Sequence, residues 1–347
     1  MNSNAIIEDR EPAVPVEKDP DILAAAARLA GEDLCSIADL SSAEVRAILK
    51  LGRDVKRDPR KYRHALDAKQ MVLMFEKASL RTRISFETGI NTMGGNALFL
   101  DQTKSPLGER EPIADVGHNL ERWIDVIVLR TSAHDTITEM AANSSAPVIN
   151  ALSDFEHPCQ ALADFMTLEE HFGSAAGLNF TYVGDGNNVC HSLMLTGAHL
   201  GANVTVATPC SYSPDINVVT KAQDIAHANG CELRLLQDPQ VAAVGADVIY
   251  TDVCVSMGFE HEAAKREPIF RPYQVNEALM QKAAPHAVFM HCLPAHRNSE
   301  VTDGVIDGPQ SIVFDEAGNR LHAQKAVLLL LLGGLANVES FHVAANS

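Results

Sequence analysis

Short apolar runs rich in β-branched residues alternate along the chain with longer segments of helical periodicity. Such runs, bounded by turn residues, are typical of buried strands. The predicted strands are Met71–Phe75, Ala97–Leu100, Ile124–Leu129, Pro147–Ile149, Asn179–Val183, Asn203–Ala207, Glu232–Leu235, Asp247–Thr251, Ala287–His291 and Ile312–Phe314. The predicted helices include Ser41–Lys56, His157–Phe172, Asn188–Leu200, Pro214–Ala228 and Gln274–Ala284.

This alternation predicts the α/β class, with mainly parallel sheets flanked by helices. Ten strands divide naturally into two sheets, and Gly173-Ser-Ala-Ala-Gly177 is the best linker signal between them. A length of 347 residues also fits about two domains. We therefore expect a partly disordered N-terminal extension over residues 1–30, a first domain over 31–172 and a second over 173–323.

Composition and charge exclude several classes of protein. The chain has 45 acidic and 28 basic side chains, a net charge of −17, and therefore lacks the basic surface that a nucleic-acid binder needs. Its seven cysteines are scattered without CxxC pairs, which suits a reducing cytosol. No secretory signal is visible in the acidic first 30 residues, and the apolar run Val327–Leu332 is too short to span a bilayer. We expect a cytoplasmic protein that binds neither nucleic acid nor membranes.

Polar clusters follow five of the apolar runs directly. In parallel α/β sheets, ligands gather at the carboxyl ends of the strands, so these clusters are expected to meet in one cleft. They are Ser79-Leu-Arg-Thr82, Arg130-Thr-Ser132, Gly184-Asp-Gly-Asn-Asn188, Asp252 to Gly258, and His291-Cys-Leu-Pro294.

The segment Phe75 to Glu87 predicts an anion site. A strand leads into a helix whose first turn carries the hydroxyls of Ser79 and Thr82 and the guanidiniums of Arg81 and Arg83. A helix N-terminus offers unpaired N–H groups and a positive dipole end, and arginine matches phosphate oxygens. The alternative is an ordinary capped helix with two surface arginines.

The segment His157-Pro-Cys-Gln160 opens a second helix of interest. His157 and Gln160 lie three residues apart and therefore on one helical face. A histidine donates to a developing oxyanion, and a glutamine amide both accepts and donates. The alternative is a helix cap with a structural histidine.

Two further clusters suit the binding of an amino acid. The run Gly184 to Asn188 begins like a dinucleotide fingerprint, but Val189 stands where the third glycine belongs, and two adjacent asparagines are better suited to a carboxylate. Asp252 directly follows a strand and could pair with an amine. The alternative is that Asp252 caps a turn.

The run His291 to His296 is not expected to bind a metal. Zinc sites show paired ligands, and no CxxC or HExxH partner occurs elsewhere in the chain. A turn at Leu293-Pro294 that aims carbonyls into the cleft, with Cys292 beside it, is preferred. Arg320, taken alone, is interpreted as a surface arginine.

Taken together, these motifs resemble the aspartate and ornithine carbamoyltransferases, from about Leu34 to the C-terminus. The Ser-x-Arg-Thr-Arg and His-Pro-x-Gln segments resemble the signature of the whole family. Asp252-x-x-x-Ser256-Met257-Gly258 and His291-Cys-Leu-Pro294 resemble the ornithine branch. The resemblance implies transfer of the carbamoyl group from carbamoyl phosphate to the δ-amine of L-ornithine, which gives L-citrulline and phosphate without a metal or organic cofactor. Another amine, such as putrescine or acetylornithine, is the alternative substrate, and a non-catalytic relative is the alternative from another class.

The resemblance also implies roles for individual residues. The residues expected to bind carbamoyl phosphate are Ser79, Leu80, Arg81, Thr82, Arg130, His157, Gln160, Cys292, Leu293 and Arg320. Those expected to bind ornithine are Asn188, Asp252, Ser256 and Met257. The expected catalytic residues are Arg130 and His157 at the carbonyl oxygen, and Cys292 and Asp252 near the reacting amine.

The resemblance further implies a homotrimer or a multiple of trimers. Its first domain would bind carbamoyl phosphate and include a C-terminal helix, residues 324–347, that packs back onto it; the second would bind ornithine. Two residues depart from the family pattern: Leu80 replaces a common threonine, and Pro106 stands where a glutamine often reaches a neighbouring subunit's site. Because proline lacks an amide side chain, Gln102, Lys104 or Ser105 would have to substitute, or the contact is lost.

Overall fold

The computed structural model describes residues 18–254 and 262–338, so that Ser256 and Met257 lie outside the described residues. Within these ranges the chain forms two wholly parallel sheets, with strand orders β2-β1-β3-β4 and β7-β6-β5-β8-β9. The strands are β1 (Gln70–Phe75), β2 (Asn96–Asp101), β3 (Val126–Arg130), β4 (Val148–Leu152), β5 (Asn179–Val183), β6 (Asn203–Ala207), β7 (Leu233–Leu236), β8 (Val248–Thr251) and β9 (Val288–His291).

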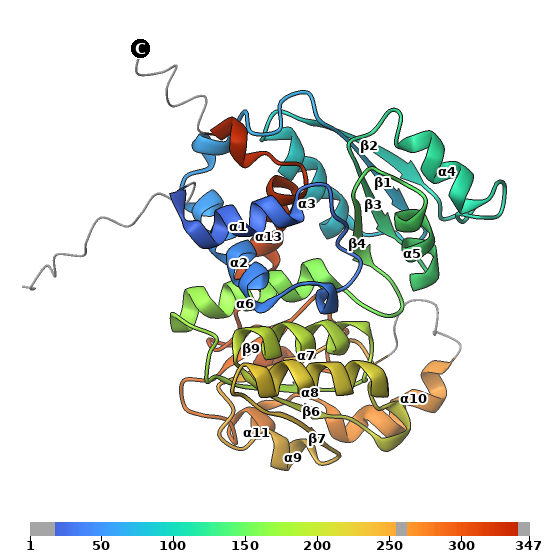
Figure 1. The fold of residues 1–347 in the computed structure, drawn as a ribbon. Coiled ribbons are helices and arrows are strands. Elements are labelled where there is room, and N and C mark those ends of the chain that lie inside the picture. The colour runs from blue at the N-terminus through green and yellow to red at the C-terminus, as the bar shows by residue number, and fades with distance from the viewer. Residues whose placement is uncertain (1–17, 255–261, 339–347) are drawn as a thin grey trace, which may run out of the picture.

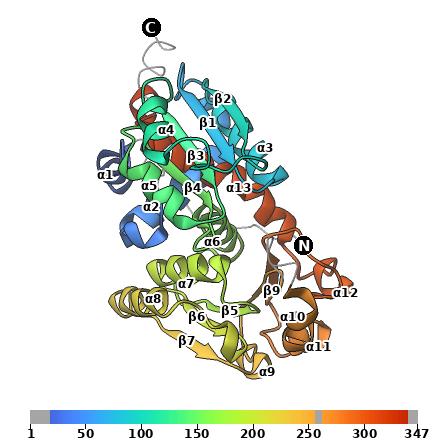
Figure 2. The same cartoon turned by 90° about the vertical axis from the view of Figure 1, so that its right-hand side faces the viewer.

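Helices flank both sheets, and the two sheets occupy separate lobes (Figures 1 and 2). The α-helices are α1 (Pro20–Leu29), α2 (Ser42–Arg57), α3 (Leu80–Asn91), α4 (Ile113–Leu120), α5 (His134–Ala142), α6 (Pro158–Phe172), α7 (Asn188–Leu200), α8 (Ile216–Ala228), α9 (Pro239–Ala242), α10 (Ala263–Phe270), α11 (Glu277–Met280), α12 (Asp303–Ile306) and α13 (Val313–Leu331). The predicted α/β class with two mainly parallel sheets is confirmed.

Two predicted elements are wrong. Ile312–Phe314 is not a strand, because α13 begins at Val313, and a run of only three apolar residues could not outweigh the long helical segment that follows it. Asp315 and Glu316 in the first turn also favour a helix start by complementing its dipole. The helix predicted over Gln274–Ala284 shrinks to α11, which Asn276 caps.

Helix α13 connects the two lobes. It begins near β9 of the second sheet and packs along α2, α3 and α6 of the first lobe (Figure 1). Its apolar run Val327–Leu331 is buried in the largest core cluster of the described residues. The chain passes from the first sheet to the second through α6 and the segment that begins at Gly173, whose φ of +85° suits a glycine that ends a helix.

Helix α1 lies within the segment predicted as an N-terminal extension. Asp19 caps it, and Ile22 and Leu29 are buried against the first lobe, where α1 contacts α2 and α13. Among the described residues, no helix combines the length and the hydrophobicity needed to cross a bilayer.

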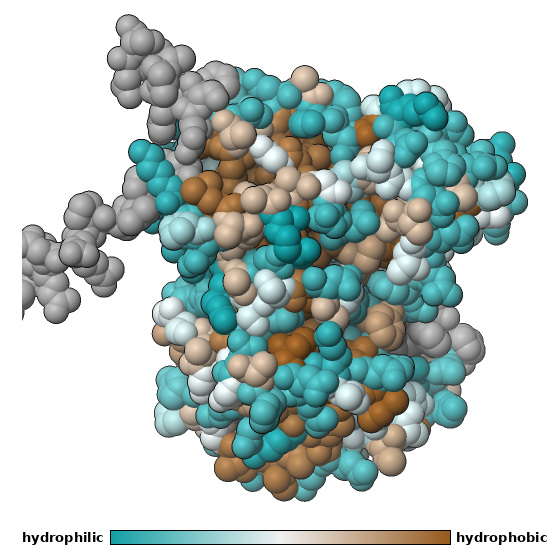
Figure 3. Space-filling model, in the orientation of Figure 1, coloured by the Kyte–Doolittle hydropathy of each residue, from teal (hydrophilic) through white to brown (hydrophobic). Residues whose placement is uncertain are grey.

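Exposed apolar side chains occur on both lobes. In the orientation of Figure 3, hydrophobic side chains gather over the lower lobe. Exposed apolar residues of the second domain include Leu235 of β7, Val241 of α9 and Val244. On the first lobe, Leu80 and Ile84 of α3 and Leu98 and Leu100 of the edge strand β2 are exposed.

Candidate active site

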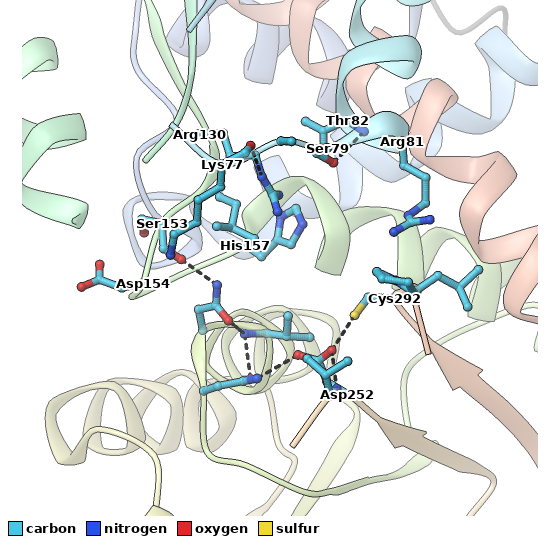
Figure 4. A pocket seen from close by; sticks show the side chains of 18 of the residues that line it. Lys77, Ser79, Arg81, Thr82, Arg130, Ser153, Asp154, His157, Asp252 and Cys292 are labelled. Atoms are coloured by element: carbon cyan, nitrogen blue, oxygen red, sulfur yellow. Dashed lines mark hydrogen bonds between the residues drawn. The ribbon is translucent and has the colours of Figure 1, made fainter. Parts of the chain in front are cut away.

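One cavity of about 540 Å³ lies between the two lobes, at the carboxyl ends of the strands. Segments that follow β1, β4, β5, β8 and β9 line it, together with Arg130 at the end of β3. Figure 4 shows these side chains converging on the cavity from both lobes. Residues of all five predicted polar clusters therefore meet at one cleft, while residues 255–258 of the fourth cluster lie outside the described residues.

The N-terminus of α3 forms one wall of the cavity. Ser79 caps the helix, because its Oγ accepts from the Thr82 backbone N–H at 3.3 Å and lies 3.0 Å from Thr82 Oγ1. Arg81 lines the cavity, whereas Arg83 is exposed, stacks on the Phe99 ring at 3.8 Å and pairs with Glu87. Only one of the two arginines at the helix start therefore belongs to the site.

Three arginines, Arg81, Arg130 and Arg320, line the same part of the cavity. Burial, together with the charges of Arg320 and Arg81, lowers the pKa of Arg130 to about 10. None of the three forms an ion pair with a carboxylate of the described residues. A buried positive site of this kind needs an anionic ligand to balance its charge.

Arg320 is buried, in contrast to the surface position expected for it alone. Its Nη1 donates to Gln160 Oε1 at 2.6 Å and lies 3.4 Å from His157 Nε2, while Nη2 donates to Thr82 Oγ1 at 2.9 Å. Gln160 does not line the cavity; it lies behind Arg320 and is 1% exposed.

His157 is buried and neutral. Burial, with the charges of Arg320, Arg130 and Arg81, holds the pKa of His157 well below its ordinary value. Since a guanidinium only donates, His157 Nε2 accepts from Arg320, and the ring proton therefore belongs on Nδ1. This Nδ1 is buried and has no hydrogen-bond partner among the described residues, so its N–H is an unsatisfied donor.

The second lobe contributes a carboxylate with a complete set of partners. Asp252 Oδ1 accepts from the Cys292 thiol at 3.0 Å and from the Val253 N–H at 2.7 Å, and Oδ2 accepts from Asn187 Nδ2 at 2.8 Å. Asn187 also caps α7 through its Oδ1, so its amide orientation is fixed. Burial and the Asp252 charge raise the pKa of the Cys292 thiol well above its ordinary value, so the sulfur stays protonated.

Asn188 joins the two lobes across the cavity, because its Nδ2 donates to the Ser153 carbonyl at 2.6 Å. The glycine before the asparagines has a packing role. A Cβ atom on Gly186 would lie 2.3 Å from the Pro214 backbone nitrogen, so this loop needs glycine for close backbone approach and not for a pyrophosphate.

The turn after β9 places Cys292 and Leu293 on the cavity wall. Leu293 has a φ of +54°, and its N–H donates to His291 Nδ1 at 2.9 Å. The ligand atoms of Asp252, His291 and Cys292 lie within 4.8 Å of one another, close enough for a metal among the described residues. A metal there would have to replace the Cys292–Asp252 and Leu293–His291 hydrogen bonds, and the absence of a metal stays a prediction from the sequence.

Four charged residues that line the cavity were not assigned a role from the sequence: Lys77, Asp154, Asp185 and Arg266. Arg266 of α10 pairs with Asp185 at 2.5 Å and lies over the Tyr212 ring at 4.7 Å. Burial raises the pKa of Asp185 to about 6 in spite of this pair. The sequence could have indicated Lys77 and Asp185, because both lie in polar segments that follow a strand. No local sequence pattern indicates Arg266.

Comparison with known proteins supports the family resemblance. Residues 32–170 match the model of the aspartate/ornithine carbamoyltransferase carbamoyl-P binding domain, and residues 176–331 match that of the Asp/Orn binding domain. An ornithine carbamoyltransferase of Pyrococcus horikoshii is 50% identical over 309 residues, which are 88% of this chain and 98% of the relative. One of Shewanella oneidensis is 51% identical over 296 residues, 85% of this chain and 98% of the relative.

Solved structures agree with this result. The ornithine carbamoyltransferase from Pyrococcus furiosus superimposes with a TM-score of 0.85 at 49% identity, covering 88% of this chain and 98% of that one. The enzyme from Thermus thermophilus gives a TM-score of 0.78 at 44% identity, with 86% and 98% covered. The chain therefore belongs to the aspartate/ornithine carbamoyltransferase family.

Proposed function

We propose that the protein transfers the carbamoyl group from carbamoyl phosphate to the δ-amine of L-ornithine and releases L-citrulline and phosphate. The observation that carries the proposal is the cavity itself. On one side it combines a helix N-terminus with three arginines that have no carboxylate partner in the described part of the chain, and on the other it has Asp252, Asn188 and Cys292. The first set suits a phosphorylated carbonyl compound, and the second suits an amino acid.

The first domain, residues 31–172 with the C-terminal helix, would bind carbamoyl phosphate. Phosphate oxygens would accept from the helix N-terminus at Ser79, Leu80, Arg81 and Thr82, while Arg320 would complete the anion pocket. Arg130 and the Nδ1–H of His157 would donate to the carbonyl oxygen. Gln160 would act from behind Arg320, and the Cys292 and Leu293 carbonyls would accept from the carbamoyl NH2.

The second domain, residues 173–323, would hold ornithine. Asn188 would bind the α-carboxylate of ornithine, and Asp252 would bind an amino group. Ser256 and Met257 are also proposed to contact ornithine. The neutral δ-amine attacks the carbonyl carbon, a tetrahedral oxyanion forms, the C–O bond to phosphate breaks, and the proton that the amine loses balances as hydrogen phosphate. Orientation and charge stabilisation then supply the catalysis without a covalent intermediate.

Ornithine is favoured over putrescine or acetylornithine as the acceptor. Relatives named ornithine carbamoyltransferase match the chain over nearly their whole length at about half identity. Putrescine has no carboxylate, so a pocket for it would not need Asn188 as a hydrogen-bond donor to a carboxylate. We also retain a cytoplasmic location, a prediction that rests on cysteine usage.

The assembly is proposed to be a homotrimer or a multiple of trimers. Leu80 and Ile84 of α3 and Leu98 and Leu100 of the edge strand β2 are exposed apolar side chains that suit a subunit interface, and Leu80 also lines the cavity. Analytical ultracentrifugation of wild type and Leu98→Asp tests this, because a charge at a buried interface should release smaller species.

The function is tested by steady-state assays with carbamoyl phosphate and one of three amines: ornithine, putrescine or acetylornithine. We expect citrulline from ornithine, with the highest kcat/KM of the three. Calorimetry with carbamoyl phosphate in the absence of amine should give a heat of binding. A protein that binds no carbamoyl phosphate would be a non-catalytic relative, and a preference for another amine would refute ornithine as the substrate.

A further inference from the structure

Arg81, Arg130 and Arg320 line what we call the anion half of the cavity. Two carboxyl groups that the transfer scheme does not use lie buried behind it. Asp164 of α6 and Glu316 of α13 have no exposed surface, and their side chains hydrogen-bond each other. Burial raises the pKa of Asp164 to about 7 and that of Glu316 well above its ordinary value. Two adjacent buried carboxylates do not both ionise, so the pair holds one proton between its oxygens.

The donors around this acid pair come from both lobes. Gln160 Nε2 donates to Asp164 Oδ1 at 2.7 Å and to Glu316 Oε1 at 3.0 Å. The Tyr250 hydroxyl of β8 lies 3.2 Å from Asp164 Oδ2 and from Glu316 Oε1. Glu316 Oε2 accepts from the His291 N–H of β9 at 3.0 Å. The acid pair therefore ties α6 and α13 to two strands of the second sheet, directly below the cavity.

This arrangement fixes the amide of Gln160 in one orientation. Because both carboxyl groups occupy Gln160 Nε2, the amide oxygen faces Arg320 and accepts from its Nη1 at 2.6 Å. A flipped amide would place NH2 against a guanidinium and oxygen against carboxyl oxygens, which leaves buried groups unpaired. The orientation of Gln160 in turn holds Arg320 against Thr82 and His157.

An amide between the acid pair and Arg320 also keeps the guanidinium available to a ligand. A carboxylate in direct contact would neutralise Arg320 and compete with phosphate for its donors. The neutral Gln160 side chain orients Arg320 and leaves the positive charge of its guanidinium uncompensated. The acid pair can therefore orient the arginine at a distance of one side chain.

We propose that Asp164 and Glu316 are positioning residues for the carbamoyl phosphate half of the site, acting through Gln160 on Arg320. The inference rests on the proposed function, in which Arg320 binds the anion. Neither acid touches the substrate in this scheme, and their proposed effect on anion binding passes through Gln160 and Arg320.

The test compares Asp164→Leu with Asp164→Asn. Leucine removes the nearer of the two acceptors of Gln160 Nε2 and leaves only Glu316. We therefore expect the KM for carbamoyl phosphate and the Kd for inorganic phosphate to rise about 10- to 100-fold, as when an outer-shell carboxylate is lost beside a metal ligand. Asparagine keeps an acceptor for Gln160 and supplies an N–H in place of the shared proton. It should stay within about threefold of wild type, since one neutral hydrogen bond replaces another.

Asp54→Leu is the matched control, because Asp54 is also buried, on α2, and accepts from Tyr62 and Lys61 away from the cavity. It should lower the melting temperature and leave both constants unchanged. If Asp164→Leu behaves like this control, the positioning role is wrong. If Asp164→Asn is as impaired as Asp164→Leu, the hypothesis that Asp164 and Glu316 share one proton is wrong.

Two measurements separate this inference from the proposed function. Citrulline formation by wild type tests the function alone, before any variant is compared. Phosphate binding by calorimetry tests the positioning of Arg320 even when no amine is turned over. If Asp164→Leu does not fold, Gln160→Met removes the same link, and unchanged phosphate affinity in that variant would overturn the proposal.

Discussion

The cavity has an anion half with three arginines and an amine half with Asp252, and the two differ in whether their charged groups already have partners in the protein. In the anion half, Arg81, Arg130 and Arg320 have no carboxylate partner among the described residues, so positive charge there is uncompensated. In the amine half, the Asp252 carboxylate already accepts from Cys292, Val253 and Asn187. The anion half can therefore bind a negatively charged ligand directly. In the amine half, the amine of the substrate must compete with protein donors for the Asp252 carboxylate.

The largest expected effect comes from removing a donor of the anion half. Arg81→Ala and His157→Ala should each lower kcat at least about 10²–10³-fold, the typical loss for one preorganised donor to a developing charge. Stopped-time citrulline assays at saturating substrates measure this. Circular dichroism should show an unchanged fold, because both side chains line the cavity.

Arg83→Ala is the control for Arg81→Ala. It lies two residues along the same helix but points away, stacked on Phe99 and paired with Glu87. Its kcat and KM values should stay close to wild type. Equal losses in both variants would mean that the effect arises from α3 in general and not from the cavity.

The contrast between Arg81 and Arg83 also marks the limit of the sequence. Strand ends and helix starts follow from local patterns, so the position of the anion site was predictable from Ser79 to Thr82. Which of two arginines faces the cavity depends on how α3 packs on its neighbours. That packing is set by contacts with α13, far away in the chain.

Arg320 illustrates the same limit more strongly. By itself it was interpreted as a surface arginine, yet α13 buries it behind Thr82 and His157. Its place depended on a helix whose start was predicted as a strand, and only the family resemblance assigned it to the site. Long-range contacts of this kind leave no periodic signal in the sequence.

A smaller effect is expected in the amine half. Asp252→Asn should raise the KM for ornithine about 10- to 100-fold, because a hydrogen bond to a charged group contributes about 1.5–3 kcal/mol. The affinity for carbamoyl phosphate, measured by calorimetry without amine, should remain unchanged. Asp247→Asn, which lies at the opposite end of β8, is the control and should leave the ornithine KM unaltered. An unchanged ornithine KM in Asp252→Asn would mean that this carboxylate does not bind the amino acid.

The smallest effect is expected at Cys292. Burial and the neighbouring Asp252 carboxylate raise the pKa of its thiol, and a raised pKa means that the neutral S–H form persists from pH 7 to above pH 9. The thiol then acts as a hydrogen-bond donor to Asp252 and not as a thiolate nucleophile. Serine retains a donor, so Cys292→Ser should lose less than about tenfold in kcat.

The pH profile decides between these two roles of the sulfur. The δ-amine of ornithine must be neutral to attack, so kcat/KM should rise with pH in any case. The profiles of wild type and Cys292→Ser should therefore superimpose between pH 7 and pH 9 after scaling. A limb that is present in wild type and missing in the serine variant would reveal a titrating thiolate. Such a result would show that the amine half carries reactive charge of its own, and the contrast between the two halves of the cavity would no longer hold.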